Sequence, residues 1–118
     1  MLRLAAEHDT LTVVDDQVGC PTFTGHLAPV LVELATRTRA PGVMHLVASG
    51  DCSWYQFAVE IMRATNTSVE VRPCSTDEFP RPARRPTYSV LRSQRPETPV
   101  LPGWRDGLSD YLSARVRT

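Results

Sequence analysis

A polar segment at residues 11–24 carries side chains whose types and spacing could contact a ligand. Gly19 permits a positive φ or a close approach of the backbone, and Pro21 restricts the chain before the next predicted helix. The side chains of Gln17 and Thr22 would then be held in place, as a ligand contact requires. The same residue types are typical of a plain turn before a helix, so the segment alone leaves both interpretations open.

The only dense positive cluster in the sequence lies in a proline-rich segment at residues 79–91. This segment contains Arg81, Arg84 and Arg85, and its three prolines predict an extended, stiff loop. A guanidinium group can donate two parallel hydrogen bonds to phosphate oxygens, so arginines on a stiff loop could clamp a diphosphate. A solvated run of charge that keeps the loop soluble is the alternative interpretation.

Several kinds of catalytic chemistry are excluded by residues that the sequence lacks. All 13 basic residues are arginine, and without lysine the chain has no Schiff base, no phosphate-loop lysine and no tyrosine–lysine proton relay. It also has no GxGxxG loop, so we expect no Rossmann-type cofactor site. Its three cysteines and three histidines are scattered without metal-ligand spacing, and we expect neither a disulfide framework nor a metal site.

Length and composition indicate one globular domain, residues 1–118, with a single core. The 13 acidic and 13 basic residues leave no positive surplus for nucleic acid. No apolar run approaches the ~20 residues that a membrane span requires, and the first ten residues do not resemble a secretory signal. We therefore expect a cytoplasmic protein that binds neither nucleic acid nor membrane.

Hydrophobic periodicity predicts the elements that must position these residues, in an α/β class chain that amounts to a small α+β fragment. Trp54 and Phe57 share an apolar helix face, and we expect both to pack in the core. The apolar run at 43–48 predicts a strand buried on both faces. The expected elements are a helix end at 1–8, strands at 10–14, 43–48 and 69–72, a helix at 24–38, a helix opened by a Ser53–Gln56 capping box, a helical turn at 75–78 and a C-terminal helix from Trp104.

Three motifs follow one another along the chain: VVDDQVGCPTFTGHLA at 13–28, CSWYQFA at 52–58 and ARRPTYSVL at 83–91. In this order and spacing they resemble the C-terminal part of the deoxythymidine diphosphate (dTDP)-4-dehydrorhamnose reductases. That family belongs to the extended short-chain dehydrogenase/reductase superfamily. The resemblance covers nearly the whole chain.

The resemblance implies a fold and an activity. The family reduces the 4-keto group of dTDP-4-dehydro-β-L-rhamnose with NADPH and forms dTDP-L-rhamnose. A large N-terminal Rossmann domain holds the cofactor and a Tyr-x-x-x-Lys catalytic pair, and a smaller C-terminal domain binds the substrate. This chain is similar to the smaller domain with the Rossmann half absent, so we expect no catalytic and no cofactor-binding residues in it. The isolated chain is therefore predicted to be inactive.

The resemblance also implies residue roles in binding the dTDP-sugar. The implied substrate-binding residues are Gln17, Gly19, Pro21 and Thr22 beside the sugar and, at the diphosphate, Arg85 with Arg84 as a second candidate.

We expect the chain to be a truncated or separately expressed substrate-binding half, whose Met1 corresponds to an internal methionine of a longer protein. Its expected partners are a dTDP-sugar and either a Rossmann-domain partner or a second copy that covers an exposed apolar face. Three other interpretations stay open. They are a non-catalytic binding or regulatory module of reductase-like fold, an epimerase or dehydratase for another sugar nucleotide, and a gene fragment without a function of its own.

Overall fold

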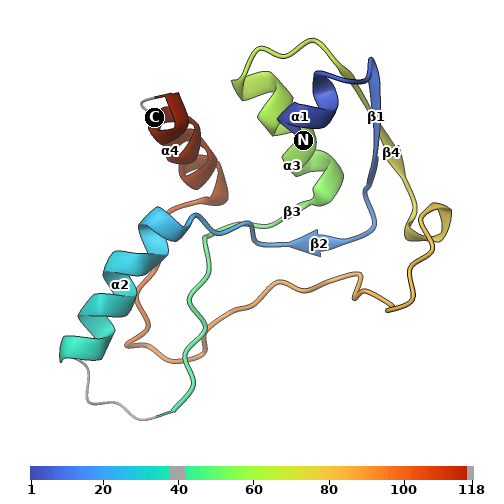
Figure 1. The fold of residues 1–118 in the computed structure, drawn as a ribbon. Helices are drawn as coiled ribbons and strands as arrows, with labels where there is room; N and C mark the ends of the chain where they lie inside the picture. The colour runs from blue at the N-terminus through green and yellow to red at the C-terminus, as the bar shows by residue number, and fades with distance from the viewer. Residues whose placement is uncertain (38–41, 117–118) are drawn as a thin grey trace. The chain divides into compact units, whose positions relative to one another are not determined.

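The computed structural model describes residues 1–37 and 42–116 and has the predicted small α+β class (Figure 1). Its elements in chain order are α1 Leu2–Ala5, β1 Thr10–Val14, β2 Val18–Gly19, α2 Thr24–Arg37, β3 Cys52–Ser53, α3 Trp54–Ala64, β4 Glu70–Cys74, the short 3₁₀ helix η1 Thr76–Glu78 and α4 Trp104–Val116. No described helix is long and apolar enough to cross a membrane.

The chain divides into two compact units. Unit 1 consists of Met1–Gly19 and Cys52–Ser89, and unit 2 consists of Cys20–Asp51 and Val90–Thr118. The sequence predicts a single core, whereas each unit buries its own apolar side chains. The assignment of residues 1–118 to one domain stays a prediction.

Unit 1 is organised around the parallel pair of β1 and β4, which run side by side from Thr10 opposite Glu70 to Val14 opposite Cys74. Burial alternates along β1, as its sequence predicts, so its inner side chains pack against α3. The buried residues of this core are Leu11, Val13, Ala58 and Met62. The strand predicted at 69–72 is confirmed as β4, which continues through Pro73. Proline has no backbone N–H, but each strand of a two-stranded sheet has an edge without a partner strand, where no donor is needed.

Helix α3 begins at the predicted capping box. Ser53 Oγ accepts a hydrogen bond from the backbone N–H of Gln56 at 3.0 Å, and Gln56 Oε1 accepts one from the backbone N–H of Ser53 at 3.0 Å. The expectation that Trp54 packs in the core is wrong, since its side chain is 50% exposed. Trp54 lies one turn before the buried Ala58, but at this end of the helix the same side borders an open cavity.

Unit 2 contains α2 and α4 together with two extended segments. The C-terminal helix is confirmed, and its Trp104 and Leu108 are buried with Ala48 and Leu101. The helix predicted at 24–38 is confirmed as α2, with residue 38 outside the described residues.

The strand predicted at 43–48 does not form. Residues 42–48 have no regular structure, and Val43 is 78% exposed rather than buried on both faces. The backbone N–H of Ala48 donates to Thr22 Oγ1 at 3.1 Å, and that of Ser49 donates to the carbonyl of Pro102 at 3.0 Å. A strand requires a neighbouring strand along its length, and this segment finds only separate acceptors.

Candidate functional site

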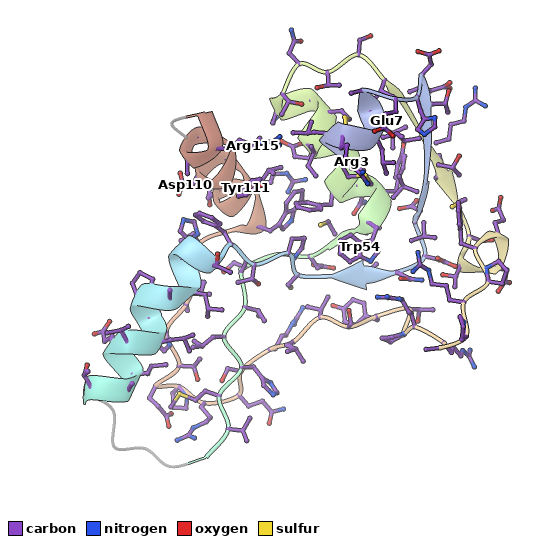
Figure 2. All side chains as sticks on the ribbon, in the orientation of Figure 1. Arg3, Glu7, Trp54, Asp110, Tyr111 and Arg115 are labelled. Carbon is purple, nitrogen blue, oxygen red and sulfur yellow. The ribbon has the colours of Figure 1, made fainter. Side chains whose placement is uncertain are left out.

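An open cavity of about 940 Å³ lies within unit 1 at the carboxyl end of the parallel pair. It is bordered by the last residues of β1, the start of α3, η1 and the proline-rich loop that follows. Loops that leave the carboxyl ends of neighbouring parallel strands converge at one edge, which makes this edge a common position for ligands. We call this space the unit 1 cavity. Figure 2 shows the side chains on the ribbon, with Trp54 at the start of α3.

Three arginines of the proline-rich loop line the unit 1 cavity. Arg81, Arg84 and Arg85 are exposed, and among the described residues, 1–37 and 42–116, none of their guanidinium groups has a hydrogen-bond or ion-pair partner. By contrast, Arg63 and Arg72 of the same unit each pair with a glutamate. The donors of the three loop arginines are therefore available to an anionic ligand.

The loop after β1 is hydrogen-bonded to Thr76 of η1, which lines the unit 1 cavity. Asp16 Oδ1 accepts a hydrogen bond from Thr76 Oγ1 at 2.6 Å, and Asp16 Oδ2 accepts one from the Thr76 backbone N–H at 2.9 Å. The Thr76 hydroxyl, followed by its backbone N–H, holds the pKa of Asp16 below its usual range. Gln17 Nε2 donates to the same hydroxyl at 2.9 Å, so its carbonyl oxygen is the atom left to meet a ligand.

The neighbouring Asp15 is hydrogen-bonded to the start of α3, which also borders the unit 1 cavity. Ser53 Oγ donates to Asp15 Oδ1 at 2.5 Å, and Ser53 is the buried residue that caps α3. The start of α3, and with it Trp54, is therefore held by the same loop that holds η1. The sequence analysis gives no role to Asp15 or Asp16, so these bonds are found only in the structure. Two successive carboxylates directly after a strand were the available signal, but their partners lie 38 and 60 residues further along the chain.

The structure brings together only some of the residues that the sequence singled out. Gln17, Arg84 and Arg85 line the unit 1 cavity. Gly19 does not line it but pairs with Cys52 in the β2–β3 ladder, where an added Cβ would lie 3.2 Å from Ser89 Oγ. The close backbone approach expected of this glycine is therefore present, whereas a positive φ is not.

Pro21 and Thr22 belong to unit 2 and do not line the unit 1 cavity. Both are half-buried. Thr22 Oγ1 donates to the carbonyl of Cys20 at 3.1 Å and accepts the backbone N–H of Ala48 at 3.1 Å, so its hydroxyl serves the local fold.

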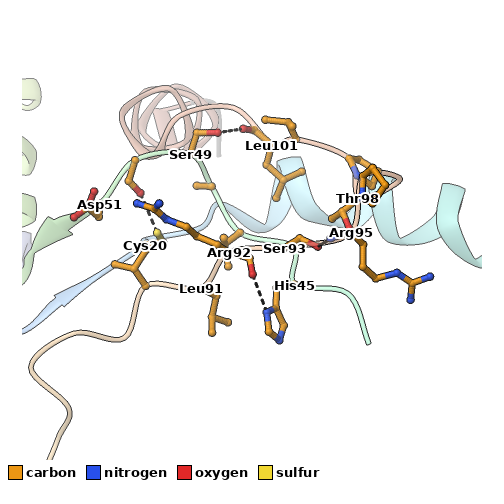
Figure 3. A pocket seen from close by; sticks show the side chains of 17 residues that line it. Cys20, His45, Ser49, Asp51, Leu91, Arg92, Ser93, Arg95, Thr98 and Leu101 are labelled. Atoms are coloured by element: carbon orange, nitrogen blue, oxygen red, sulfur yellow. Dashed lines mark hydrogen bonds between the residues drawn. The ribbon is translucent and has the colours of Figure 1, made fainter. Parts of the chain in front are cut away.

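Unit 2 has a cavity of its own, about 530 Å³ in volume, which Figure 3 shows from close by. Cys20 Sγ donates to the carbonyl of Gly50 at 2.9 Å, and His45 Nδ1 donates to the carbonyl of Arg92 at 3.2 Å. Burial, with the nearby charge of Asp51, raises the pKa of the Cys20 thiol. A thiol that stays protonated at neutral pH is a poor nucleophile, so this cavity does not have the chemistry of a cysteine active site.

A metal centre is not apparent in the part of the chain that the structure describes. Within 1–37 and 42–116, no group of three histidine, cysteine or carboxylate side chains could hold an ion.

Known proteins similar to this chain include several dTDP-4-dehydrorhamnose reductases. The family model described as the RmlD substrate binding domain matches residues 1–116. The dTDP-4-dehydrorhamnose reductase of Mycolicibacterium smegmatis is 42% identical over 121 residues, covering 98% of this chain and 37% of the relative.

Two crystal structures are similar in fold as well as in sequence. A dTDP-4-dehydrorhamnose reductase of Clostridium acetobutylicum has a TM-score of 0.91 at 43% identity, covering 98% of this chain and 42% of the other. That of Bacillus anthracis, in complex with NADP, has a TM-score of 0.89 at 33% identity, covering 96% and 41%. The chain thus spans about two fifths of the length of these relatives.

The described residues do not fit a dinucleotide such as the NADP of the Bacillus anthracis protein. A Rossmann site places glycines after its first parallel strand, so that backbone N–H groups at a helix start face the pyrophosphate. After β1 this chain has Asp15 and Asp16 instead, with their carboxylates bound to Ser53 and Thr76. The loop after β1 therefore lacks the glycine backbone N–H groups with which a Rossmann site holds the pyrophosphate of a dinucleotide.

Proposed function

This chain belongs to the RmlD substrate-binding domain family, and on that premise we propose that it binds the sugar nucleotide of a dTDP-4-dehydrorhamnose reductase. The parent activity is the NADPH-dependent reduction of dTDP-4-dehydro-β-L-rhamnose to dTDP-L-rhamnose. The observation that carries the proposal is a set of three arginines, unpaired among the described residues, around one cavity at the carboxyl end of a parallel strand pair.

The proposed ligand contact is between the diphosphate and the proline-rich loop. Arg85, with Arg84 beside it, donates to the phosphate oxygens, and the carbonyl oxygen of Gln17 is available to a hydroxyl group of the ligand. The side chains that line the cavity include three arginines and two aspartates, which leaves a surplus of positive charge. The carboxylate of one of these aspartates, Asp16, is hydrogen-bonded to Thr76. The loop therefore favours an anion. Gly19, Pro21 and Thr22 remain proposed sugar-side residues on the sequence resemblance alone.

The chain contributes binding and orientation rather than proton transfer. A tyrosine serves as the proton donor of a reductase when a neighbouring lysine lowers its pKa, and this sequence has three tyrosines but no lysine. Interactions with the nucleotide, remote from the reacting carbon, are a source of binding energy that orients the keto sugar.

A cytoplasmic location and a protein partner complete the proposal. The location is supported by the three cysteines, which form no disulfide bond within the described residues, as is typical of a reducing compartment. The partner is a Rossmann-type domain or a second copy of the chain. Support for it comes from apolar side chains left partly exposed in unit 1, including Met1 at 39% and Leu4 at 40%.

Calorimetric titration with dTDP tests the proposal, once circular dichroism has shown that each variant is folded. We expect the wild-type chain to bind and Arg85→Ala to weaken binding by roughly 10-fold or more, because a hydrogen bond to a charged group contributes about 1.5–3 kcal/mol. Arg72→Ala is the matched control, since Arg72 is an exposed arginine of unit 1 that pairs with Glu70 and does not line the cavity. A folded wild type without affinity for dTDP, or an Arg85→Ala variant that binds as the wild type does, would contradict the proposal.

A further inference from the structure

We propose that the indole of Trp54 is the surface on which the base of the bound nucleotide stacks, with the diphosphate held by the arginines of the same cavity. This inference rests on the proposed function and assigns a residue to the part of the ligand that the arginines do not recognise. It begins from the exposure of Trp54.

Trp54 is exposed in a way that the fold itself does not explain. Half of its surface is open to solvent, whereas the chain's other tryptophan, Trp104, is 3% exposed. Leaving an indole in water forfeits the stabilisation that burial would bring, and indoles are typical of binding surfaces because they combine a large apolar face with a polar edge.

The indole is held in position before any ligand arrives. Trp54 is the first residue of α3, directly after Ser53, whose side chain is bonded to both Gln56 and Asp15. Its ring also contacts the ring of Phe57, with centroids 6.5 Å apart at 65°. A rigid aromatic side chain loses little conformational entropy on binding.

The surroundings of the indole favour a nucleotide over an apolar protein surface. Trp54 lines the same cavity as Arg81, Arg84 and Arg85, whose guanidinium groups are unpaired among the described residues. An apolar partner covering Trp54 would bury these charges without counter-charges, at a high cost in free energy. A nucleoside diphosphate offers a π-face to the indole and phosphate oxygens to the arginines, the combination that proteins use to hold nucleotides.

Two ligands distinguish the contact of Trp54 with the base from the contacts of the arginines with the diphosphate. We would titrate dTDP and inorganic pyrophosphate, which lacks the base, into the wild-type chain and its variants. We expect Trp54→Ala to weaken dTDP binding on the order of 10-fold and to leave pyrophosphate binding unchanged, because the substitution removes the aromatic face on which the base would stack and pyrophosphate has no base. Trp54→Phe keeps an aromatic face and should retain most of the affinity. Arg85→Ala should weaken the binding of both ligands.

Fluorescence provides a second readout, because Trp54 is the exposed one of only two tryptophans. We expect dTDP to change the emission of the wild-type chain, and the change to disappear in Trp54→Phe, where Trp104 is the remaining indole. Tyr88→Ala is the matched control. Tyr88 is a 56% exposed aromatic residue of unit 1 that does not line the cavity, and its replacement should affect neither ligand.

The outcomes distinguish failure of this inference from failure of the proposed function. If Trp54→Ala binds dTDP as tightly as the wild type while Arg85→Ala does not, stacking on Trp54 is wrong and the proposed function stands. Phe79 is the other exposed aromatic residue of this cavity. If Phe79→Ala weakens dTDP binding and Trp54→Ala does not, stacking on Trp54 is likewise wrong and the proposed function stands. An equal loss of pyrophosphate and dTDP binding in Trp54→Ala would mean that Trp54 shapes the loop and would also overturn the inference. A folded wild type that does not bind dTDP overturns both proposals.

Discussion

Asp16 shows how a single exposed carboxylate can organise one side of the unit 1 cavity. It accepts hydrogen bonds from both the hydroxyl and the backbone N–H of Thr76, and Gln17 donates to the same hydroxyl. Gln17, which the sequence predicts as a ligand contact, thus also supports the local fold. Its side-chain Nε2 donates to Thr76, and its side-chain oxygen is available to a ligand. The residues nearest the proposed ligand therefore position one another as well as meeting it.

The stability of the chain should depend on the charge of Asp16. Its pKa is lowered in the folded chain, so its contribution is fully present above the unfolded value of about 3.9 and is lost as the pH falls through the lower folded value. We expect Asp16→Asn to be less stable than the wild type at neutral pH and the gap to narrow on acidification below about pH 4. Urea unfolding across this range measures the gap.

Asp77→Asn is the control for charge alone, because it removes an aspartate from the same cavity and leaves the Asp16 bonds to Thr76 intact. A gap between Asp16→Asn and the wild type that stays constant from neutral to acid pH would show that the charged form of Asp16 is not what stabilises the fold.

At the scale of elements, the start of α3 joins the core to the proposed site. The capping box begins the helix, Ala58 and Met62 bury its inner face against β1, and Trp54 at its first position borders the cavity. Ser53 connects these roles, because its hydroxyl accepts the N–H of Gln56 and donates to Asp15. The cap therefore orients the residue proposed to stack the base.

We expect Ser53→Ala to lower the free energy of unfolding by about 2 kcal/mol, since the variant loses a helix cap and leaves the carboxylate of Asp15 without its hydroxyl donor. Thermal or urea unfolding measures the loss. Ser75→Ala is a useful comparison, because Ser75 is exposed and precedes only the three-residue η1, and its replacement should cost less than about 0.5 kcal/mol. Equal stability of Ser53→Ala and the wild type would show that the cap does not hold α3.

At the scale of the whole molecule, the chain divides into two compact units, and its likeness to relatives extends over about two fifths of their length. The loop after its first parallel strand is occupied by carboxylates where a dinucleotide fold has glycines.

The isolated chain should therefore have no reductase activity. We expect no oxidation of NADPH above the protein-free rate when the keto sugar nucleotide is supplied, because the chain has neither a glycine-rich loop nor a lysine beside a tyrosine. The absorbance of NADPH measures the rate, and the same preparation must bind dTDP to show that it is folded. NADPH oxidation that depends on both the purified chain and the keto sugar would refute this expectation.

The sequence by itself determined the local elements and the family. The strand at 10–14, the Ser53–Gln56 capping box and the C-terminal helix are confirmed, because alternation, capping and helical periodicity depend on residues only a few positions apart. The RmlD family match confirms the resemblance that three motifs had indicated. The roles of the six proposed substrate-binding residues stay predictions.

Only the tertiary structure decided which residues share a surface. The bonds from Asp15 to Ser53 and from Asp16 to Thr76, the exposure of Trp54 and the failure of the predicted strand at 43–48 all depend on what lies beside a segment in space. Local patterns carry little information about such neighbours, because contacts between distant positions form only when the whole chain packs. The cavity with its three arginines arises at this level, and so does the proposed role of its indole.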